Sequence, residues 1–344
     1  MTTLITRPSI NGANHPTVAF AERKASTTNL FAEITDLVTL NEETGQIDED
    51  SLACDLQGLF NSVNGDKICD LHLWKDTGGK LLGFGQLTCD RNENIECSLC
   101  FDVHPSRQAS TLESEILQWS EQRIREAGQK FTLPIRLQTR VRSDKLRYRM
   151  QLEKQGFTSE RCFLTMARSL DRSVCSFSLP EGFRLRSLYD RGCLAQISGN
   201  NLKAWVELFN ESFVDHWNHH NLTVAAARHW FSNPHCKPEL NLVVVAPDGA
   251  LAAFCVGYLN REENARTGRN EGWIKLLGTR RSFRRLGLGR AILLAAIRQF
   301  EALGIEQVKL AVDTQSLTSA TQLYESVGFY PISTWLTYEK EIQP

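Results

Sequence analysis

Arginines and glycines are concentrated in one segment near the C-terminal end, Arg280–Arg290 (RRSFRRLGLGR). Five arginines surround a Gly-x-Gly pair, Gly287 and Gly289, and an apolar helical pattern follows directly. Glycine has no Cβ, so a ligand can approach the backbone N–H groups at a helix start, where unpaired donors and the helix dipole favour anions. Because a strand-like run, Trp273–Leu277, precedes the loop, the order strand, turn, helix predicts a site for a phosphorylated ligand.

Other interpretations of this segment are a solvated basic turn or a different nucleotide motif. Short Gly-x-Gly pairs occur by chance, so the loop alone leaves the basic turn open. The dinucleotide fingerprint needs a third glycine where Ile292 stands, and the Gly-Lys-Ser/Thr ending of the P-loop is absent. These two nucleotide motifs are therefore excluded.

The segment after the loop has a specific order of elements. A strand is expected over Gln307–Asp313, where Val308, Leu310 and Val312 alternate with other residues. A short helix then ends in Leu-Tyr-Glu-x-x-Gly-Phe, at Leu323–Phe329. Residues 272–342 as a whole closely resemble the core of the GNAT superfamily of N-acetyltransferases.

The family signature is Gln/Arg-x-x-Gly-x-Gly/Ala, which Arg284, Gly287 and Gly289 match. The resemblance implies that acetyl-coenzyme A is the co-substrate and that its diphosphate is held by backbone amides; no metal is expected. Ser316 is also explained as the N-cap of the last helix. The residues expected to contact the coenzyme are Leu277, Gly278, Thr279, Arg284, Arg285, Leu286, Gly287, Leu288, Gly289, Arg290 and Ser316.

The resemblance also assigns catalytic roles. Tyr324 is expected to protonate the departing thiolate; the alternative is a tyrosine that only packs in the core. Backbone N–H groups are expected to polarise the thioester where Trp273–Leu277 splays from Val308–Val312, at a bulge that several relatives keep. Some relatives carry the general base where Trp273 stands here, so Glu271, about 7 Å away on the same strand face, is the candidate. A solvated strand-end carboxylate is the alternative for Glu271.

The acceptor amine is expected near the segment that follows an amphipathic helix over residues 204–213. In this superfamily that region commonly lines the acceptor site, and aromatic and imidazole groups beside an acid suit a polar, cationic acceptor. A hydrated helix cap and a metal site are the alternatives, although no cysteine or carboxylate set completes the latter. The predicted acceptor residues are Asp215, His216, Trp217, His219, His220 and Glu262. Glu262 and its neighbour Glu263 are expected at the end of a strand, where they would add negative potential to the same site.

The first half of the chain repeats the same order of elements. Thr111 and Glu113 replace the signature glycines, and Leu152 replaces the tyrosine, so this copy is expected to be structural and to shape the acceptor pocket. The expected elements of this copy are strands over 81–88 and 96–103, a helix over 111–127, a strand over 133–139, a helix over 143–154 and a strand over 162–168.

We therefore expect an α/β (α+β) protein of two tandem GNAT-fold domains, each a mixed, mostly antiparallel sheet flanked by helices. The tandem arrangement resembles two-copy GNAT proteins in which the C-terminal copy is catalytic. The expected division is a flexible segment 1–26, a degenerate non-catalytic domain 27–170, a linker 171–182 and a catalytic domain 183–344.

Composition bounds the remaining possibilities. The chain has 344 residues, 42% of them hydrophobic, and a formal net charge of −1, so nothing global favours nucleic acid or an anionic membrane. No segment is long and apolar enough for a bilayer span or a signal peptide. The ten cysteines are scattered, and Cys97-x-x-Cys100 has no second pair. Buried free thiols in a cytoplasmic protein are expected rather than a zinc site or redox pair.

The sequence thus predicts an acyltransferase that transfers an acetyl group from acetyl-coenzyme A to the primary amine of a small molecule, by direct attack in a ternary complex. The alternative is a coenzyme A-binding sensor or scaffold without turnover. No nucleic-acid or membrane partner is expected, and a tandem chain favours a monomer or a weak homodimer.

Overall fold

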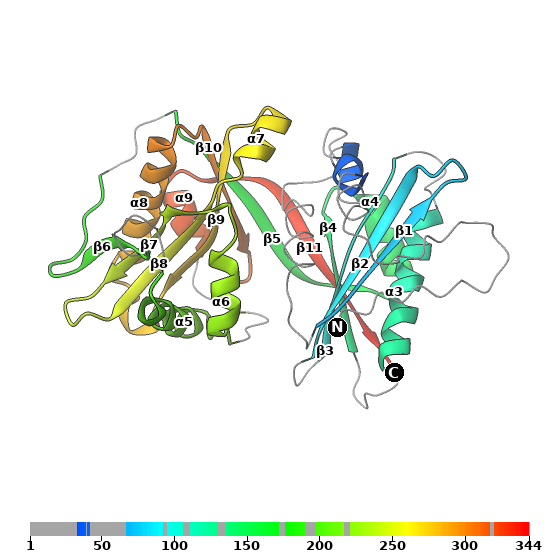
Figure 1. The fold of residues 1–344 in the computed structure, drawn as a ribbon, viewed down its shortest axis with the longest axis horizontal. Helices are drawn as coiled ribbons and strands as arrows, with labels where there is room; N and C mark the ends of the chain where they lie inside the picture. Colours follow the sequence, from blue (N-terminus) through cyan, green and yellow to red (C-terminus); the bar gives the residue numbers. More distant parts are fainter. Residues whose placement is uncertain are drawn as a thin grey trace. The chain divides into compact units, whose positions relative to one another are not determined.

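The computed structural model describes residues 33–38, 40–41, 67–91, 95–105, 111–128, 135–171, 176–189, 197–216, 221–316 and 320–343. The chain forms two compact units (Figure 1). Unit 1 comprises Met1–Arg161 and Trp335–Pro344, and unit 2 comprises Cys162–Thr334.

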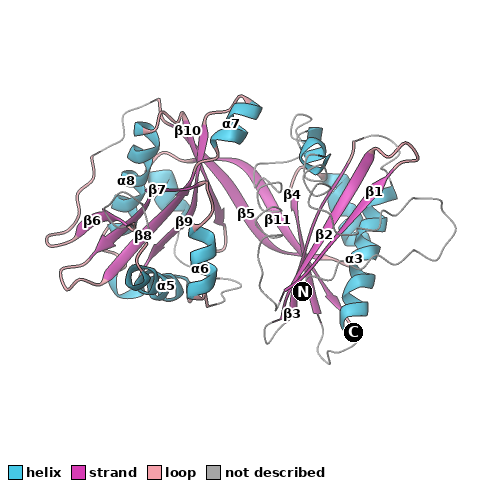
Figure 2. Cartoon of the chain, in the orientation of Figure 1, coloured by secondary structure: helices cyan, strands magenta, loops and turns pink. Residues whose placement is uncertain are grey.

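The sheet of unit 1 has the strand order β1-β2-β3-β4-β11. Its pairs are antiparallel except for β3 and β4, which run parallel from Glu96↔Arg136 to Leu99↔Thr139. Helix α3, labelled in Figure 2, and helix α4 belong to this unit. Residues 33–38 are also helical, and Ile34, Leu37 and Val38 pack against Leu81 and Phe84. The element bounds are β1 Lys67–Lys75, β2 Leu81–Arg91, β3 Ile95–Val103, α3 Leu112–Gly128, β4 Ile135–Arg142, α4 Leu146–Lys154 and, within β11 (Tyr330–Ile342), residues Trp335–Ile342.

Helix α3 packs its apolar side on this sheet because its buried residues recur at helical spacing. Ile116, Leu117 and Ile124 are at most 1% exposed. Two glycines of β2 allow the helix to approach closely. A Cβ at Gly85 would lie 3.1 Å from Ile116 and from Trp119.

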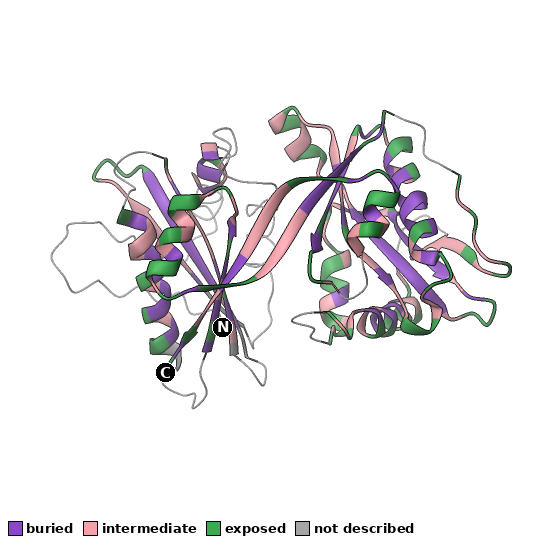
Figure 3. Ribbon diagram, turned by 180° about the vertical axis from the view of Figure 1, so that it is seen from behind, coloured by how far each residue is buried: buried purple, intermediate pink, exposed green. Residues whose placement is uncertain are grey.

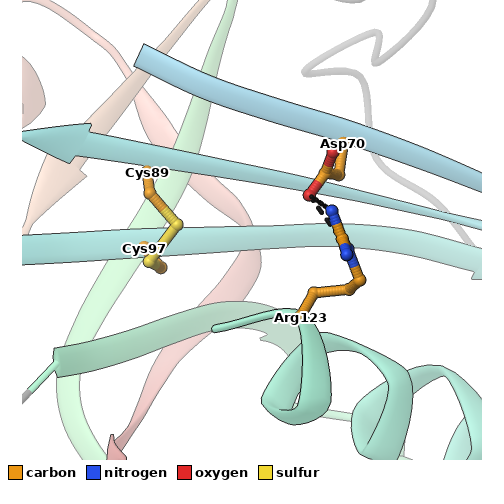
Figure 4. Close-up of a disulfide and its surroundings, with 4 residues drawn as sticks. All are labelled: Asp70, Cys89, Cys97 and Arg123. Atoms are coloured by element: carbon orange, nitrogen blue, oxygen red, sulfur yellow. Dashed lines mark hydrogen bonds and ion pairs between the residues drawn. A yellow bond between two sulfur atoms is a disulfide. The ribbon is translucent and has the colours of Figure 1, made fainter. Parts of the chain in front are cut away.

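Two cysteines of unit 1 correct an expectation from the sequence. Cys89 of β2 and Cys97 of β3 are directly opposite residues in the antiparallel ladder, and their sulfurs form a disulfide (Figure 4). Opposite positions bring Cβ atoms to the separation that a disulfide needs. The expectation of free thiols was therefore wrong for this pair. Cys100, Cys162, Cys236 and Cys255 are not part of a disulfide.

The sheet of unit 2 has the strand order β5-β10-β9-β8-β7-β6. Its pairs are antiparallel except for β9 and β10, which run parallel. The strand bounds are β5 Thr158–Ser169, β6 Arg184–Ser187, β7 Cys236–Val245, β8 Leu251–Tyr258, β9 Glu271–Thr279 and β10 Gln307–Asp313. The helix bounds are α5 Gly199–Phe213, α6 Val224–Phe231, α7 Arg261–Thr267, η2 Arg281–Phe283, α8 Leu288–Ala302 and α9 Ala320–Ser326.

Helices cover both faces of this sheet. Buried residues of α8, including Ile292 and Phe300, pack with Val308 and Leu310 of β10 in one core. A second core joins Trp205 of α5 to the opposite face of β7 and β8. Residues coloured as buried run along the strands of this sheet and recur along its helices (Figure 3). Both units thus have the mixed, mostly antiparallel sheet flanked by helices that the sequence predicted.

Two strands lie in a different unit from the one that the expected linker at residues 171–182 implied. Residues 163–169 of β5 pair with β10, so they lie in unit 2. Residues 335–342 of β11 pair with β4, so they lie in unit 1. Sequential division placed each of these strands in the other domain, because strand pairing between distant segments leaves no local signal in a sequence. No helix in the described part of the chain is long and apolar enough to cross a membrane.

Candidate functional site

The loop between β9 and α8 presents an uncapped helix start. Gly287 is the N-cap of α8, with a φ of 77° and no side-chain cap. Glycine adopts this left-handed conformation at little cost, and a Cβ there would meet nothing within 4 Å. The first backbone N–H groups of α8 therefore have no side-chain acceptor from the N-cap, which is the arrangement that binds phosphate groups.

A second left-handed residue lies two positions earlier. Arg285 has a φ of 66° and is the one non-glycine residue with positive φ in the described part of the chain. Such a conformation costs a residue with a Cβ of order 1 kcal/mol or more, and it persists where the surroundings require it. Arg285 and Gly287 thus place two left-handed residues directly before the start of α8.

The five loop arginines divide by their partners. Arg281 and Arg284 both bind the carboxylate of Asp215, and Arg280 Nε lies 3.2 Å from Glu211 Oε2, an ion pair that lacks hydrogen-bond geometry. The other two arginines of the loop, Arg285 and Arg290, are exposed, and no ion pair with a described residue involves them.

Strands β9 and β10 separate next to this loop. Their parallel register runs from Gln307↔Glu271 to Leu310↔Ile274 and goes no further. On the other edge of β9, Val256 is opposite Leu276 while Gly257 is opposite Ile274, which makes Lys275 a bulge residue. The splay and the bulge that the sequence resemblance implied lie at the same point of β9.

Tyr324 of α9 is buried beside the core of unit 2. Its side chain is 8% exposed, and its ring packs edge-on against Phe329, with centroids 6.1 Å apart. Burial raises the pKa of the Tyr324 phenol, and the neighbouring thiol of Cys255 raises it further. Burial likewise raises the pKa of Cys255. Tyr324 is therefore a protonated phenol at neutral pH.

Arg168 is a residue of this region that sequence reasoning missed. It lies on β5, is 9% exposed and donates from Nη1 to the backbone carbonyl of Val327. Gly328 has a φ of 89°, and a Cβ added to it would lie 3.8 Å from Nη1 of Arg168. Arg168 thus supports the turn that ends the Tyr324 helix. A buried arginine from the other half of the sequence gives no local signal of this role.

Glu271 lies at the start of β9 in an ion pair. Its Oε2 is 2.6 Å from Nζ of Lys309, and its Oε1 is 4.0 Å from Nη1 of Arg269. The side chains of Glu271 and Lys309 are 12% and 5% exposed. Lys309 is opposite Trp273 in the parallel register. Nζ of Lys275 lies 4.8 Å from the centroid of the Trp273 ring.

The predicted acceptor residues are only partly described. Asp215 is half-buried and bound by arginines, and His216 is exposed, with its ring 5.6 Å from that of Phe213. Trp217, His219 and His220 lie outside the described residues. Glu262 is in the first turn of α7 rather than at the end of a strand, because Asn260 caps a helix there.

The remaining predicted coenzyme contacts lie around the loop. Gly278 is pressed against Phe254, whose ring would be 2.3 Å from a Cβ, so no side chain fits there. Thr279 Oγ1 would lie 3.4 Å from a Cβ at Gly289. Leu277 is half-buried, whereas Leu286 is 46% exposed and Leu288 is buried. Ser316 lies four residues before Ala320, the first described residue of α9, and residues 317–319 lie outside the described residues, so its role as an N-cap stays a prediction.

Unit 1 repeats part of this site without its functional groups. Its parallel strands β3 and β4 also stop pairing after four residue pairs, and Gly156 has a φ of 84° after α4, as Gly328 has after α9. In place of Tyr324 stands Leu152, which is fully buried in the core. Phe101 of β3 stacks on Tyr148 of α4 with centroids 5.0 Å apart.

The helix start of unit 1 also differs in charge. Glu113 lies in the first turn of α3, where burial raises the pKa of its carboxyl group while the charge of Arg147 lowers it. Within the described ranges, no three His, Cys, Asp or Glu side chains are arranged to hold a metal ion.

Comparison with known proteins agrees with the geometry of unit 2. Residues 202–329 match the sequence model of the Acetyltransferase (GNAT) family, and they include the glycine loop, the splayed strands and Tyr324. Over this stretch, from α5 to the turn after α9, unit 2 is similar to the GNAT acetyltransferase family.

Two curated relatives of this chain are both named mycothiol acetyltransferase. The chain is 29% identical to mycothiol acetyltransferase of Thermobispora bispora, over 51% of this chain and 55% of that protein. It is 26% identical to mycothiol acetyltransferase of Streptomyces scabiei, over 89% of this chain and 91% of that protein. The match covers about half the length of the Thermobispora protein and of several other curated relatives with the same name.

Solved structures show the same tandem fold. A GCN5-related N-acetyltransferase from Sphaerobacter thermophilus has a TM-score of 0.70 at 23% identity, covering 91% of this chain and 92% of that one. A tandem GNAT protein from the clavulanic acid biosynthesis pathway has a TM-score of 0.71 at 15% identity, covering 93% and 97%. At these identities the likeness is one of fold.

Proposed function

We propose that this protein is an acetyl-coenzyme A-dependent N-acetyltransferase that acetylates a primary amine of a small molecule. The observation that carries the proposal is the coincidence, within unit 2, of three features. They are an uncapped glycine start of α8, strands β9 and β10 that part beside it, and the buried phenol of Tyr324 in α9.

The loop fits the coenzyme's diphosphate. Gly287 leaves space at the helix start, and the exposed Arg285 and Arg290 supply positive charge without a described acidic partner. The amides after Arg285 and at the start of α8 would bind phosphate oxygens. Leu277, Gly278, Thr279, Leu286, Leu288, Gly289 and Ser316 would complete the contacts.

The coenzyme supplies an acetyl thioester, and the protein supplies donors and a proton. Backbone N–H groups at the β9 bulge would stabilise negative charge on the thioester oxygen. The acceptor nitrogen attacks the carbonyl carbon, the C–S bond breaks, and the proton of Tyr324 Oη passes to sulfur. The proton released from the amine restores the phenol.

Before it attacks, the acceptor must lose the first proton of its ammonium form, and Glu271 is our candidate for accepting that proton. An ammonium group already holds one of its carboxylate oxygens at 2.6 Å, so Glu271 must act through its other oxygen or after separating from Lys309. Acceptor contacts from His216, Trp217, His219, His220 and Glu262 belong to the same proposal.

We propose that unit 1 is a structural copy that binds no coenzyme. The Phe101–Tyr148 stack lies where its β3 parts from β4, and Glu113 places a carboxyl group at its helix start. A carboxylate there would repel a diphosphate. We further propose a cytoplasmic monomer or weak homodimer.

The test is mass spectrometry of an amine panel incubated with acetyl-coenzyme A and the purified chain. The names of the relatives put the amine precursor of mycothiol in that panel. We expect one amine to gain an acetyl group and free thiol to appear in equal amount. Tight coenzyme binding with no product from any amine would favour a coenzyme A-binding sensor instead.

A further inference from the structure

One carboxylate holds two arginines of the glycine loop. Oδ2 of Asp215 is 3.0 Å from Nη1 of Arg284, and Oδ1 accepts from Nη2 of Arg281. Asp215 comes two residues after the end of α5, whereas both arginines follow β9. The contact therefore joins two segments that are more than sixty residues apart in the sequence.

The guanidinium of Arg284 is occupied by protein acceptors on three sides. Nη2 donates to the carbonyl of Ser212 at 3.0 Å, and Nε donates to the carbonyl of Thr279 at 3.4 Å. Together with Asp215, these acceptors satisfy each nitrogen of the guanidinium fork. Arg284 is thus directed at the ends of α5 and β9, not outward from the loop.

We propose that Asp215 is a positioning residue for the coenzyme A loop, and that it acts through Arg281 and Arg284 rather than by contacting the acceptor amine. The inference rests on the proposed function, because it concerns the affinity of the loop for acetyl-coenzyme A. It replaces the acceptor contact that the sequence predicted for Asp215.

The contact of Asp215 with Arg281 and Arg284, called the clamp below, also determines which loop arginines can attract phosphate. Asp215 pairs with Arg281 and Arg284, and Glu211 pairs with Arg280, so these three arginines are directed at protein carboxylates. Arg285 and Arg290 are exposed and can attract phosphate. The hydrogen bond from Arg284 and the charge of Arg281 lower the pKa of the Asp215 carboxyl group, so the clamp stays ionised at neutral pH. A fixed Arg284 in turn fixes the start of the segment in which Arg285 adopts its left-handed conformation.

The test is titration calorimetry of acetyl-coenzyme A into the full chain, without acceptor. Asp215→Asn keeps the shape of the side chain but removes its charge, and we expect its Kd for acetyl-coenzyme A to rise about tenfold. Asp215→Glu keeps the charge and should retain most of the affinity. Glu207→Gln is the matched control, since Glu207 is an exposed acid of α5, the helix that Asp215 follows.

Steady-state rates separate the two roles. A positioning residue predicts a higher KM for acetyl-coenzyme A with unchanged KM for the acceptor. An unchanged Kd for acetyl-coenzyme A combined with a higher acceptor KM in Asp215→Asn would overturn the inference. In an Arg284→Gln background, Asp215→Asn should cost much less affinity than in the wild type, and full additivity would also overturn it.

Two controls keep the outcomes distinct. If the wild type binds no acetyl-coenzyme A, the proposed function fails; if it binds and Asp215→Asn binds equally well, only the positioning role fails. Circular dichroism checks folding of each variant. Should Asp215→Asn not fold, Arg281→Gln alters the same clamp at an exposed side chain, and wild-type affinity in it would contradict the role of that arm.

Discussion

The Nζ atom of Lys309 lies 2.6 Å from a carboxylate oxygen of Glu271, on two neighbouring parallel strands. Both side chains are largely withdrawn from water. Removing one charge of such a pair leaves the other buried without its counterion, which costs more than the pair itself contributes.

We therefore expect Glu271→Gln to lower the free energy of unfolding by about 3 kcal/mol. The double variant Glu271→Gln, Lys309→Met should recover most of this loss, because no ammonium group then remains buried. Urea denaturation followed by tryptophan fluorescence measures both. Wild-type stability in the single variant would contradict the assignment.

The same substitution tests the proposed base. If Glu271 accepts the amine proton, Glu271→Gln should reduce kcat/KM and remove the acidic limb of its pH profile. Glu301→Gln, an exposed acid on α8, is the control. An acidic limb that persists unchanged in Glu271→Gln would rule Glu271 out as the base.

Tyr324→Phe removes the proposed proton donor and keeps the ring in place. We expect kcat to fall about a hundredfold while the Kd for acetyl-coenzyme A stays unchanged, since the hydroxyl acts on the leaving thiolate. Tyr330→Phe is the control, because Tyr330 is 46% exposed in the same unit. Wild-type turnover by Tyr324→Phe would remove the assignment.

The two ends of α8 offer a matched pair of glycines. Gly287 and Gly304 have φ angles of 77° and 75°, and a Cβ at either would meet nothing within 4 Å. Alanine at each should cost about 1 kcal/mol of stability for the left-handed backbone. Only Gly287→Ala should weaken acetyl-coenzyme A binding, measured by calorimetry. Equal affinities in the two variants would argue against diphosphate binding at this helix start.

Cys89 and Cys97 are eight residues apart, and both are buried in unit 1. Opening a loop of this length should lower the free energy of unfolding by about 2–3 kcal/mol on reduction. Thermal denaturation with and without a phosphine reductant measures the change, and Cys100→Ser should not alter it. Alkylation of both cysteines in the native, unreduced protein would show that the disulfide does not form.

His72 of β1 lies between two tryptophans, with ring centroids 4.3 Å from Trp74 and 5.5 Å from Trp119. Burial, with a smaller contribution from the charge of Arg123, lowers the pKa of His72 from 6.5 to about 4. Between these values the unfolded chain binds a proton that the folded chain does not. The contribution of His72 is therefore complete above pH 6.5 and is lost as the pH falls toward 4.

The loss should amount to roughly 2 kcal/mol, allowing for partial exposure. Unfolding of the wild type and of His72→Gln between neutral pH and pH 4 measures it, and the variant should show a shallower slope. His229→Gln, at an exposed position on α6, should keep the wild-type slope. Parallel slopes for the wild type and His72→Gln would contradict this prediction. Arg123 also binds Asp70 beside this cluster (Figure 4).

Local sequence patterns predicted the elements of unit 2 that carry the site. The alternation of Val308, Leu310 and Val312 predicted β10, and the glycine pair predicted the start of α8. The spacing of residues along the sequence did not reveal which distant side chains contact these elements. Asp215 was taken for an acceptor contact because nothing in its neighbourhood points to arginines sixty-six and sixty-nine residues later.

The disulfide illustrates a signal that was present but unused. Cys89 follows one predicted strand and Cys97 lies in the next, so a hairpin register would have placed them opposite each other. The spacing Cys97-x-x-Cys100 drew attention instead. Helix α7 was missed because its seven residues follow a strand directly, and only the Asn260 cap marks its start.

The chain returns its last strand to unit 1 and lends β5 to unit 2. A protease cut within residues 176–182 would therefore yield two fragments, each lacking a strand that its sheet requires. Neither fragment should fold when expressed alone, whereas the two expressed together should reassociate, as in a split-protein reporter. The order of the strands along the chain thus differs from their division between the two sheets.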